Sequence, residues 1–367
     1  MKSLRDFDLK GKKVLVRVDF NVPLSKKGDI LDDFRIKASL PTIEYLIKKR
    51  GKIILISHLG RPEGKFVKKF SLRLVAKRLE KLLKRKVHPV KLRLRRTAFG
   101  GFNRVKFLPD CLGKKVEKEI ETMKEAEVVL LENLRFYKEE EKNDHNFAKN
   151  LAKLAEIFIN DAFSVCHRSH ASVVGVPKYL PSGAGFLLEK EIKVLSQIME
   201  NPKRPLVAII GGKKVEDKAK VVEKFSKIAD FVLTGALVAK EIKKRKIKVK
   251  SLSKILFPLD SKDNFDIGQK TIKIFQKIIQ KAKTIFWAGP LGKIEERKYQ
   301  RGTKEIIKAI LKSQAFSVVG GGDTIEFINK IGLAKKFDYL SIGGGAMLKF
   351  LAGEKLPGLE ALEYGRN

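Results

Sequence analysis

The chain has 367 residues, 43% of them hydrophobic, and 79 lysines and arginines against 42 aspartates and glutamates give it a formal net charge of +37. This length predicts two domains, and no apolar run approaches the length of a membrane span, which excludes a transmembrane protein. Two cysteines exclude a disulfide framework, and the charged residues after Met1 predict no secretory signal, so we expect a cytoplasmic protein without a membrane partner.

Strand-like apolar runs alternate with amphipathic helical segments through the first half. The predicted strands are 13–20, 52–57, 105–108, 128–132 and 157–160, and the predicted helices include 35–49 and 71–83, with Ser71 as a candidate cap. The basic segment 90–104, which holds two glycines, predicts an inserted surface hairpin or loop. Such alternation is typical of a parallel sheet with crossover helices.

The rhythm changes near the middle of the chain. Residues 179–185 predict a loop, and 188–200 predict a connecting helix that ends before Pro202. Further strands are then predicted at 206–210, 231–233, 284–287, 317–319 and 339–342. We therefore expect an α/β protein with two Rossmann-like parallel-sheet domains, 1–185 and 186–357, joined by the helix.

Polar side chains follow the predicted strands of the first half, where ligands bind in open parallel sheets. Four arginines at these edges could converge on one anion, because a guanidinium group binds carboxylate or phosphate through two hydrogen bonds. Any one of them in so basic a chain is better interpreted as a surface residue, but four at equivalent positions indicate a site. The four are Arg35, Arg61, Arg135 and Arg168. Asp19 and Asn21 could accept hydrogen bonds from substrate hydroxyls, while the histidines show no metal spacing.

Three strand–glycine–helix junctions mark the second half. Glycine lets the backbone approach a ligand, and the helix that follows presents free N–H groups, so three such turns predict a polyphosphate site. The motifs of P-loop and dinucleotide-binding proteins are absent. Asp323 is a candidate Mg²⁺ ligand or a helix N-cap, and both roles are possible together. The junctions are Gly211-Gly212-Lys213-Lys214 before a helix with Lys218, then Gly320-Gly321-Gly322-Asp323-Thr324, and finally Gly343-Gly344-Gly345.

A phosphorylated acid in one domain and a nucleotide in the other predict phosphoryl transfer. This reaction depends on in-line positioning and on positive charge around the transferring group. Lys214, Lys218 and Arg35 are the natural charge donors. We expect the two domains to close about a hinge and so bring the halves together.

The chain resembles the phosphoglycerate kinases over nearly its whole length, on a series of motifs that occur in the same order. The motifs are RVDFNVP at 17–23, SHLGRP at 57–62, LENLRF at 131–136, NDAF at 160–163, HRSHAS at 167–172, GFL at 185–187, WAGPLG at 287–292, GGGD at 320–323 and GGGA at 343–346.

This resemblance implies the phosphoglycerate kinase fold, with residues 358–367 packing back on the first domain, and a monomer. It implies reversible phosphoryl transfer from 1,3-bisphosphoglycerate to ADP, giving 3-phosphoglycerate and ATP, with Mg²⁺ as cofactor. The substrate residues are then Asp19, Asn21, Arg35, His58, Arg61, Arg135 and Arg168; the nucleotide residues are Lys218, Glu295, Gly320, Gly321, Gly322, Asp323 and Thr324, with Asp323 on the metal; and the catalytic residues are Arg35, Lys214, Gly344 and Gly345.

Four departures from the family pattern concentrate in the nucleotide half. Lys213 replaces a small residue, Ala288 replaces an asparagine, and Ile342 replaces a threonine. The stretch 235–265 is also shorter than in the family, which predicts loss of a wall around the base. We therefore expect affinity to depend on phosphates and Mg²⁺ more than on the base.

A different class of function competes with the kinase. The alternative is a basic protein on the same fold that has lost catalysis and binds RNA or another polyanion. The complete arginine set and Lys214 argue against it. The basic residues are also spread along the chain, so we expect no specific nucleic-acid partner and only weak, salt-sensitive binding.

Overall fold

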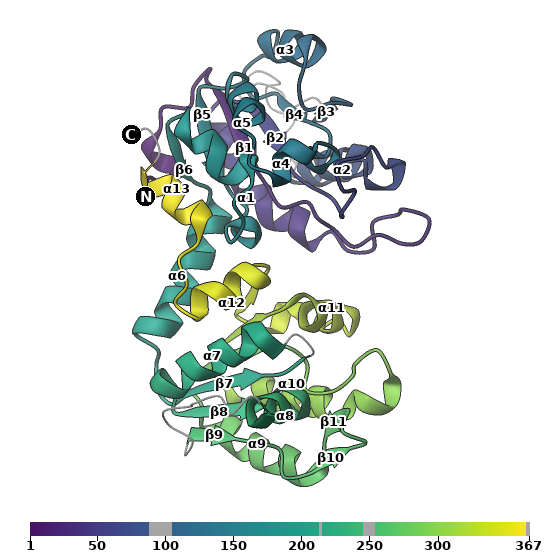
Figure 1. Cartoon of the computed structure of the whole chain (residues 1–367), viewed down its shortest axis with the longest axis vertical. Coiled ribbons are helices and arrows are strands. Elements are labelled where there is room, and N and C mark those ends of the chain that lie inside the picture. Colours follow the sequence, from purple (N-terminus) through teal and green to yellow (C-terminus); the bar gives the residue numbers. More distant parts are fainter. Residues whose placement is uncertain (88–104, 213–214, 245–253, 365–367) are drawn as a thin grey trace, which may run out of the picture. The chain divides into compact units, whose positions relative to one another are not determined.

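The structure, a computed structural model, describes residues 1–87, 105–212, 215–244 and 254–364. By their contacts the residues divide into two compact units, which are described separately (Figure 1). Unit 1 comprises Met1–Lys190 and Leu356–Asn367, and unit 2 comprises Glu191–Lys355. The hairpin or loop expected at 90–104 lies outside the described residues.

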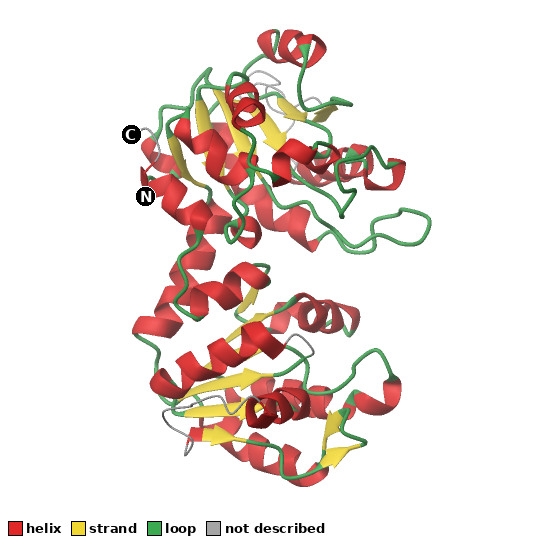
Figure 2. Ribbon diagram, in the orientation of Figure 1, coloured by secondary structure: helices red, strands yellow, loops and turns green. Residues whose placement is uncertain are grey.

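Unit 1 is built on a six-stranded parallel sheet with the strand order β3-β4-β2-β1-β5-β6 (Figure 2). The strands are β1 Lys13–Arg17, β2 Lys52–Ile56, β3 Val105–Phe107, β4 Val128–Leu130, β5 Ile157–Asn160 and β6 Ser182–Ala184. Its helices are α1 Phe34–Lys48, α2 Arg73–Val87, α3 Lys114–Glu121, α4 Lys138–Glu141, α5 His145–Ala152 and α13 Pro357–Tyr364.

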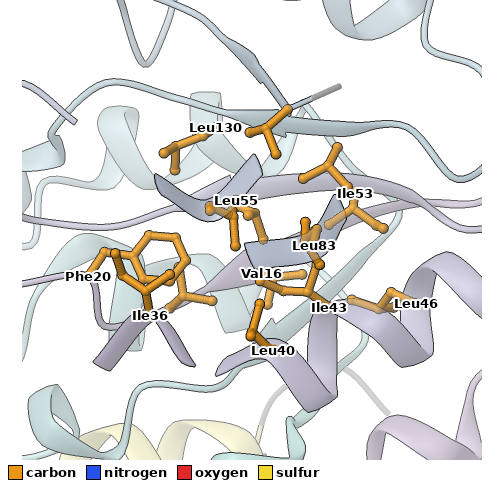
Figure 3. Close-up of a cluster of buried hydrophobic side chains, with 14 of the residues drawn as sticks. Val16, Phe20, Ile36, Leu40, Ile43, Leu46, Ile53, Leu55, Leu83 and Leu130 are labelled. Carbon is orange, nitrogen blue, oxygen red and sulfur yellow. The ribbon is translucent and has the colours of Figure 1, made fainter. Parts of the chain in front are cut away.

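One face of this sheet packs against α1 and α2 to form the main core of unit 1. Alternate strand residues such as Val16 and Leu55 contribute to the cluster, because successive side chains of a strand point to opposite faces. Ile36, Leu40 and Ile43 supply the α1 side at helical spacing (Figure 3). Burial on both faces explains why β1, β2, β4 and β5 consist mostly of apolar residues.

The edge strand β6 was missed by the sequence analysis. Residues 179–185 were expected to form a loop, whereas Ser182–Ala184 pair in parallel with Phe158–Asn160 of β5. Small residues favour turns over strands, so propensity pointed the wrong way. β6 also contacts α13, whose Gly358 N–H donates to the Cys166 carbonyl at 2.8 Å.

Unit 2 contains a second six-stranded parallel sheet, with the order β14-β13-β12-β7-β8-β9. The strands are β7 Leu206–Ile210, β8 Phe231–Thr234, β9 Ile255–Leu256, β12 Thr284–Ala288, β13 Phe316–Gly320 and β14 Tyr339–Ser341, and β10 Ser261–Lys262 pairs antiparallel with β11 Asp266–Ile267. The helices are α7 Val215–Ile228, α8 Ala236–Lys244, α9 Gln269–Lys281, α10 Arg301–Ser313, α11 Gly322–Lys330 and α12 Gly345–Leu351.

The predicted fold class is confirmed, since both units are parallel sheets with flanking helices. The short strands β9, β10 and β11 were not predicted, because two residues carry no periodic signal. The helix α6, Phe186–Glu200, begins in unit 1 and continues into unit 2. No helix among the described residues is long and apolar enough to cross a membrane.

A buried carboxylate holds the first turn of α6 in unit 1. The Leu187 backbone N–H donates to Asp161 Oδ1 at 2.9 Å, and the neighbouring Phe186 N–H donates to Thr42 Oγ1 at 3.0 Å. Asp161 is fully buried. Burial raises the pKa of Asp161 to about 8.

We expect the Asp161 carboxyl to make the folded protein less stable as pH rises from 6 to 8. The folded state binds this proton and the unfolded state does not, so stability is present below the folded pKa and is lost as pH passes through it. With the pKa of Asp161 at about 8, the wild type should lose about 2 kcal/mol relative to Asp161→Asn over this interval.

Urea unfolding of both proteins at pH 6 and pH 8 measures this difference. Asp8→Asn, which removes an exposed carboxylate, is the control and should differ from the wild type equally at both pH values. A pH-independent gap between wild type and Asp161→Asn would show that Asp161 is ionised in the folded protein.

Candidate active site

The order of the strands reverses direction once in each sheet, and several of the predicted site residues follow the strands at these points. In unit 1 the reversal lies between β1 and β5, and in unit 2 it lies between β7 and β12. Neighbouring connections leave such a pair of strands in opposite directions, which opens a crevice at their carboxyl ends. Asp19 follows β1, whereas Gly211 and Gly289 follow β7 and β12.

Asp19 organises the crevice in unit 1. Its buried carboxylate forms an ion pair with Arg35, the second residue of α1, and accepts a hydrogen bond from the Ser164 hydroxyl. The Asn21 backbone N–H donates to the other carboxylate oxygen at 3.0 Å. Asp19 therefore positions Arg35, which keeps a quarter of its side chain exposed (25%).

Asn21 and Arg135 both hold the turn after β2. The Gly60 N–H donates to Asn21 Oδ1 at 2.9 Å, and Arg135 Nη1 donates to the Gly60 carbonyl at 2.8 Å. Arg135 Nε lies 3.2 Å from Glu141, and burial lowers the pKa of this arginine to about 10. These contacts join two sequence-predicted residues to one turn.

A fully buried arginine, Arg17, was not assigned a role from the sequence. Arg17 Nη2 lies 3.0 Å from His58 Nδ1, and Arg17 Nε donates to Ser172 Oγ at 2.9 Å. Ser172 in turn donates to Glu140, which is also fully buried. Its position inside a strand hid Arg17, although an arginine at a buried strand position is itself an unusual feature that could have been noticed.

The remaining predicted arginines differ in placement. Arg168 is partly buried, and its charge contributes to the lowered pKa values of Arg135 and of His170, for which burial is the main cause. Burial and neighbouring arginines hold the pKa of His170 at about 3. Arg61 is exposed. The structure therefore brings Arg35, Arg135 and Arg168 to one electropositive region and leaves Arg61 at its surface.

The glycine turns of unit 2 allow two backbones to meet. Gly289 has φ +89°, and a Cβ there would lie 2.0 Å from the Gly211 carbonyl oxygen. Lys218, 8% exposed, donates from Nζ to that same carbonyl. Gly321 lies beside this contact, with the Gly289 nitrogen 3.6 Å from the position of a Cβ. Two of the three predicted glycine turns, those at Gly211 and Gly321, thus meet a turn at Gly289, which only the WAGPLG motif indicated.

A cavity of about 190 Å³ opens beside these turns. Asp323 and Glu295 place carboxylates on its wall, whereas Leu237, Phe265 and Leu291 give it apolar surface. Leu237 and Phe265 lie near the two ends of 235–265, the stretch expected from the sequence to be short. Apolar side chains therefore still line the cavity there, although the sequence analysis expected a base wall to be lost.

Asp323 is not the N-cap of α11, which was one of its two candidate roles. Gly321 occupies that position without a side-chain cap, and Asp323 is exposed in the first turn. Thr324 Oγ1 is buried and has no hydrogen-bond partner among the described residues. Gly320 lies buried in β13, where a Cβ would lie 2.1 Å from Met347 Sδ, so its lack of a side chain serves packing.

The third glycine turn caps α12. Gly344 is the N-cap, and a Cβ there would meet no atom within 4 Å. Gly345 is the first residue of the helix. Lys213 and Lys214 lie outside the described residues, and Ala288 is buried at the end of β12.

Comparison with known proteins gives matches along the whole chain. The phosphoglycerate kinase family model matches residues 4–254 and 236–354. The phosphoglycerate kinase of Dictyoglomus turgidum is 43% identical, with 98% of each chain covered. That of Coprothermobacter proteolyticus is 41% identical over 408 aligned positions, with 99% of this chain and 98% of the relative covered.

Solved structures give the same result. The phosphoglycerate kinase of Pyrococcus horikoshii matches with a TM-score of 0.83 and 34% identity, and that of Coxiella burnetii with a TM-score of 0.80 and 33% identity. Each comparison covers 99% of this chain and 98% of the other. Fold and crevices therefore define a two-domain α/β kinase.

The chain belongs to the phosphoglycerate kinase family. It is a glycolytic kinase that transfers phosphate to the carboxyl group of 3-phosphoglycerate, with ATP and ADP as the nucleotide substrates. The resemblance seen in the motifs is thereby confirmed.

We expect Gly289→Ala to destabilise unit 2 by at least about 2 kcal/mol, since both the positive φ and the contact with the Gly211 carbonyl oppose a Cβ. Gly322→Ala is the matched control, because a Cβ there meets no atom within 4 Å. Fluorescence of Trp287, the only tryptophan, reports urea unfolding of unit 2. Equal unfolding midpoints for the two variants would contradict the close packing of these turns.

Proposed function

We propose that unit 1 binds 3-phosphoglycerate and 1,3-bisphosphoglycerate in the crevice around Asp19. The observation that carries this proposal is the convergence of cationic side chains on one region that retains few acidic groups. The carboxylates there are already engaged, Asp19 by Arg35 and Glu141 by Arg135. The crevice therefore favours an anionic ligand. The proposed contacts are Asp19, Asn21, Arg35, His58, Arg61, Arg135 and Arg168.

The cavity of unit 2 is the proposed site of ADP and ATP. Its apolar part, formed by Leu237 and Phe265, can pack against a base, and the glycine turns expose backbone N–H groups to the phosphates. The unpaired buried hydroxyl of Thr324 is a donor for a phosphate oxygen. The other proposed contacts are Lys218, Glu295, Gly320, Gly321, Gly322 and Asp323.

The carboxylates on the cavity wall fit a magnesium ion. Mg²⁺ in nucleotide sites takes one or two carboxylates besides phosphate oxygens, and Asp323 and Glu295 line the same cavity. We assign Asp323 as the ligand. When bound, the ion neutralises the charge of the nucleotide phosphates. The described residues contain no cluster of three or more acidic, histidine or cysteine side chains that would hold a metal without a nucleotide.

Transfer itself needs positioning and charge. Arg35, oriented by Asp19, donates to the oxygens of the transferring phosphoryl group, and Lys214 supplies a second cation. The N–H groups at Gly344 and Gly345 are the proposed backbone donors. Because the phosphoryl group passes directly between the two substrates, we propose that the domains close in the complex that holds both. We further propose a cytoplasmic monomer without a specific nucleic-acid or membrane partner.

We expect Arg35→Ala and Lys214→Ala each to lower kcat by about 10² to 10³-fold and to raise KM less, since both groups act on charge that develops in the transition state. A coupled assay of ATP formation measures both constants. Arg50→Ala and Lys220→Ala, which remove exposed cations from ion pairs elsewhere in the same units, are the controls. Near-normal kcat in either test variant would remove that residue from the mechanism.

We expect ATP formation to require Mg²⁺ and Asp323→Asn to need about tenfold more Mg²⁺ for half-maximal rate, because one charged ligand is lost. Glu326→Gln, on an exposed position of the same helix, is the matched control. An unchanged Mg²⁺ requirement in Asp323→Asn would place the metal on another residue, with Glu295 as the next to test.

A further inference from the structure

A continuous chain of buried hydrogen bonds runs beneath the crevice of unit 1. It begins at Glu140, whose Oε1 accepts from Ser172 Oγ at 2.6 Å and whose Oε2 accepts from the Ser172 N–H at 2.9 Å. It continues through Arg17 Nε to Ser172 Oγ at 2.9 Å and ends with Arg17 Nη2 at 3.0 Å from His58 Nδ1. Glu140, Ser172 and Arg17 are fully buried, and His58 is 4% exposed.

The direction of each hydrogen bond follows from the donor inventory. A guanidinium group has only donors, so His58 Nδ1 must be the acceptor and carries no proton. The single hydroxyl proton of Ser172 goes to the Glu140 carboxylate, which leaves the Ser172 oxygen to accept from Arg17. The proton of a neutral His58 ring therefore lies on Nε2.

The charges around His58 keep its ring neutral. Burial is the main cause that holds the pKa of His58 well below its ordinary value. Nearby positive groups lower this pKa further, because they repel a proton on the ring: Arg17 on β1, Arg135 after β4, Arg35 on α1, and His170. Glu140 contacts Ser172 and lies 3.8 Å from His170, and it is linked to His58 through Ser172 and Arg17.

We propose that Arg17 is a positioning residue that fixes His58 as the neutral Nε2–H tautomer, so that His58 donates one hydrogen bond to a carboxylate or hydroxyl oxygen of the bound phosphoglycerate. This inference rests on the proposed placement of that substrate beside His58. His58 then contributes a directional hydrogen bond at a site where the arginines supply charge. Glu140 is the far end of the series of hydrogen bonds that holds Arg17 and, through it, His58.

The geometry requires an arginine at position 17. Three nitrogens of its planar group are used in three directions: Nε toward Ser172, Nη2 toward His58, and Nη1 toward the Val18 carbonyl at 2.5 Å. A lysine has one nitrogen and cannot hold both Ser172 and His58 from the same place. Arg17→Lys should therefore keep the positive charge and lose control of the tautomer.

The first test is a long-range ¹H–¹⁵N correlation spectrum of the histidine rings in the wild-type protein at pH 7, with His58→Gln for assignment. We expect His58 to show an unprotonated Nδ1 and a protonated Nε2. A protonated Nδ1, or a doubly protonated ring, would overturn the inference. This measurement needs no variant of Arg17.

The second test compares Arg17→Lys and Ser172→Ala with Arg50→Lys, an exposed arginine of the same unit. In the two test variants His58 should become a mixture of tautomers, and KM for 3-phosphoglycerate should rise about tenfold while kcat changes less than about threefold, because a binding contact is lost. An unchanged tautomer, or a change in kcat alone, would show that Arg17 acts only in packing.

Titration of the wild type with 3-phosphoglycerate separates the inference from the proposed function. A shift of the His58 Nε2 signal with the tautomer unchanged supports both. A substrate-induced shift in a ring protonated on Nδ1 overturns the inference and leaves the substrate site in place. No shift of His58 at saturating 3-phosphoglycerate overturns the placement of the substrate and, with it, the donor role of His58.

Discussion

Repulsion among cationic side chains is the constraint that shapes unit 1. An anion site made of arginines must hold those groups close together before any substrate arrives, at a cost that burial increases. Three carboxylates offset the repulsion: Asp19 pairs with Arg35, Glu141 lies beside Arg135, and Glu140 supports Arg17 through Ser172. Burial is the main cause of the lowered pKa values of Arg135 and His170, and neighbouring arginines lower both further. An anionic ligand would relieve the cost of this repulsion, which is why we propose this region as the site of the phosphorylated acid.

The proposed nucleotide site of unit 2 is built differently, from glycine turns that pack closely on one another. A Cβ at Gly289 would lie 2.0 Å from the Gly211 carbonyl oxygen, so the lack of side chains there is a condition for this packing. Lys218 donates a hydrogen bond to the Gly211 carbonyl, and this contact stabilises the turn. Ala288, one of the departures from the family pattern, lies buried in β12. If the nucleotide phosphates are bound by backbone groups, as we propose, a changed side chain at this position leaves those groups in place.

The sequence was most informative where periodicity and topology agree. The bounds of β5 and β7 match the prediction because each is a short apolar run between turn residues. Asp19, Asn21, Arg35 and Arg135 were singled out because they follow strands, where open parallel sheets bind their ligands, and the structure brings Asp19 to Arg35 and both Asn21 and Arg135 to Gly60. Their mutual contacts could not be predicted, because these depend on rotamers that only the packed structure specifies.

The omissions have physical causes as well. Ser182–Ala184 form a strand only because β5 offers an edge to pair with, which local propensity does not encode. Arg17 escaped notice because its role depends on Ser172 and His58, which are distant in sequence. The N-cap role of Asp323 failed because Gly321, with φ +95°, starts the helix two residues earlier.

Hydrogen–deuterium exchange with each ligand separately tests the central claim, that the two strand-order reversals hold the two substrates. We expect 3-phosphoglycerate to protect peptides that cover 17–21, 58–61 and 133–137, and Mg²⁺ with ADP to protect 211–212, 289–293 and 320–324. Protection of the unit 2 segments by 3-phosphoglycerate alone, or of the unit 1 segments by the nucleotide alone, would contradict the account.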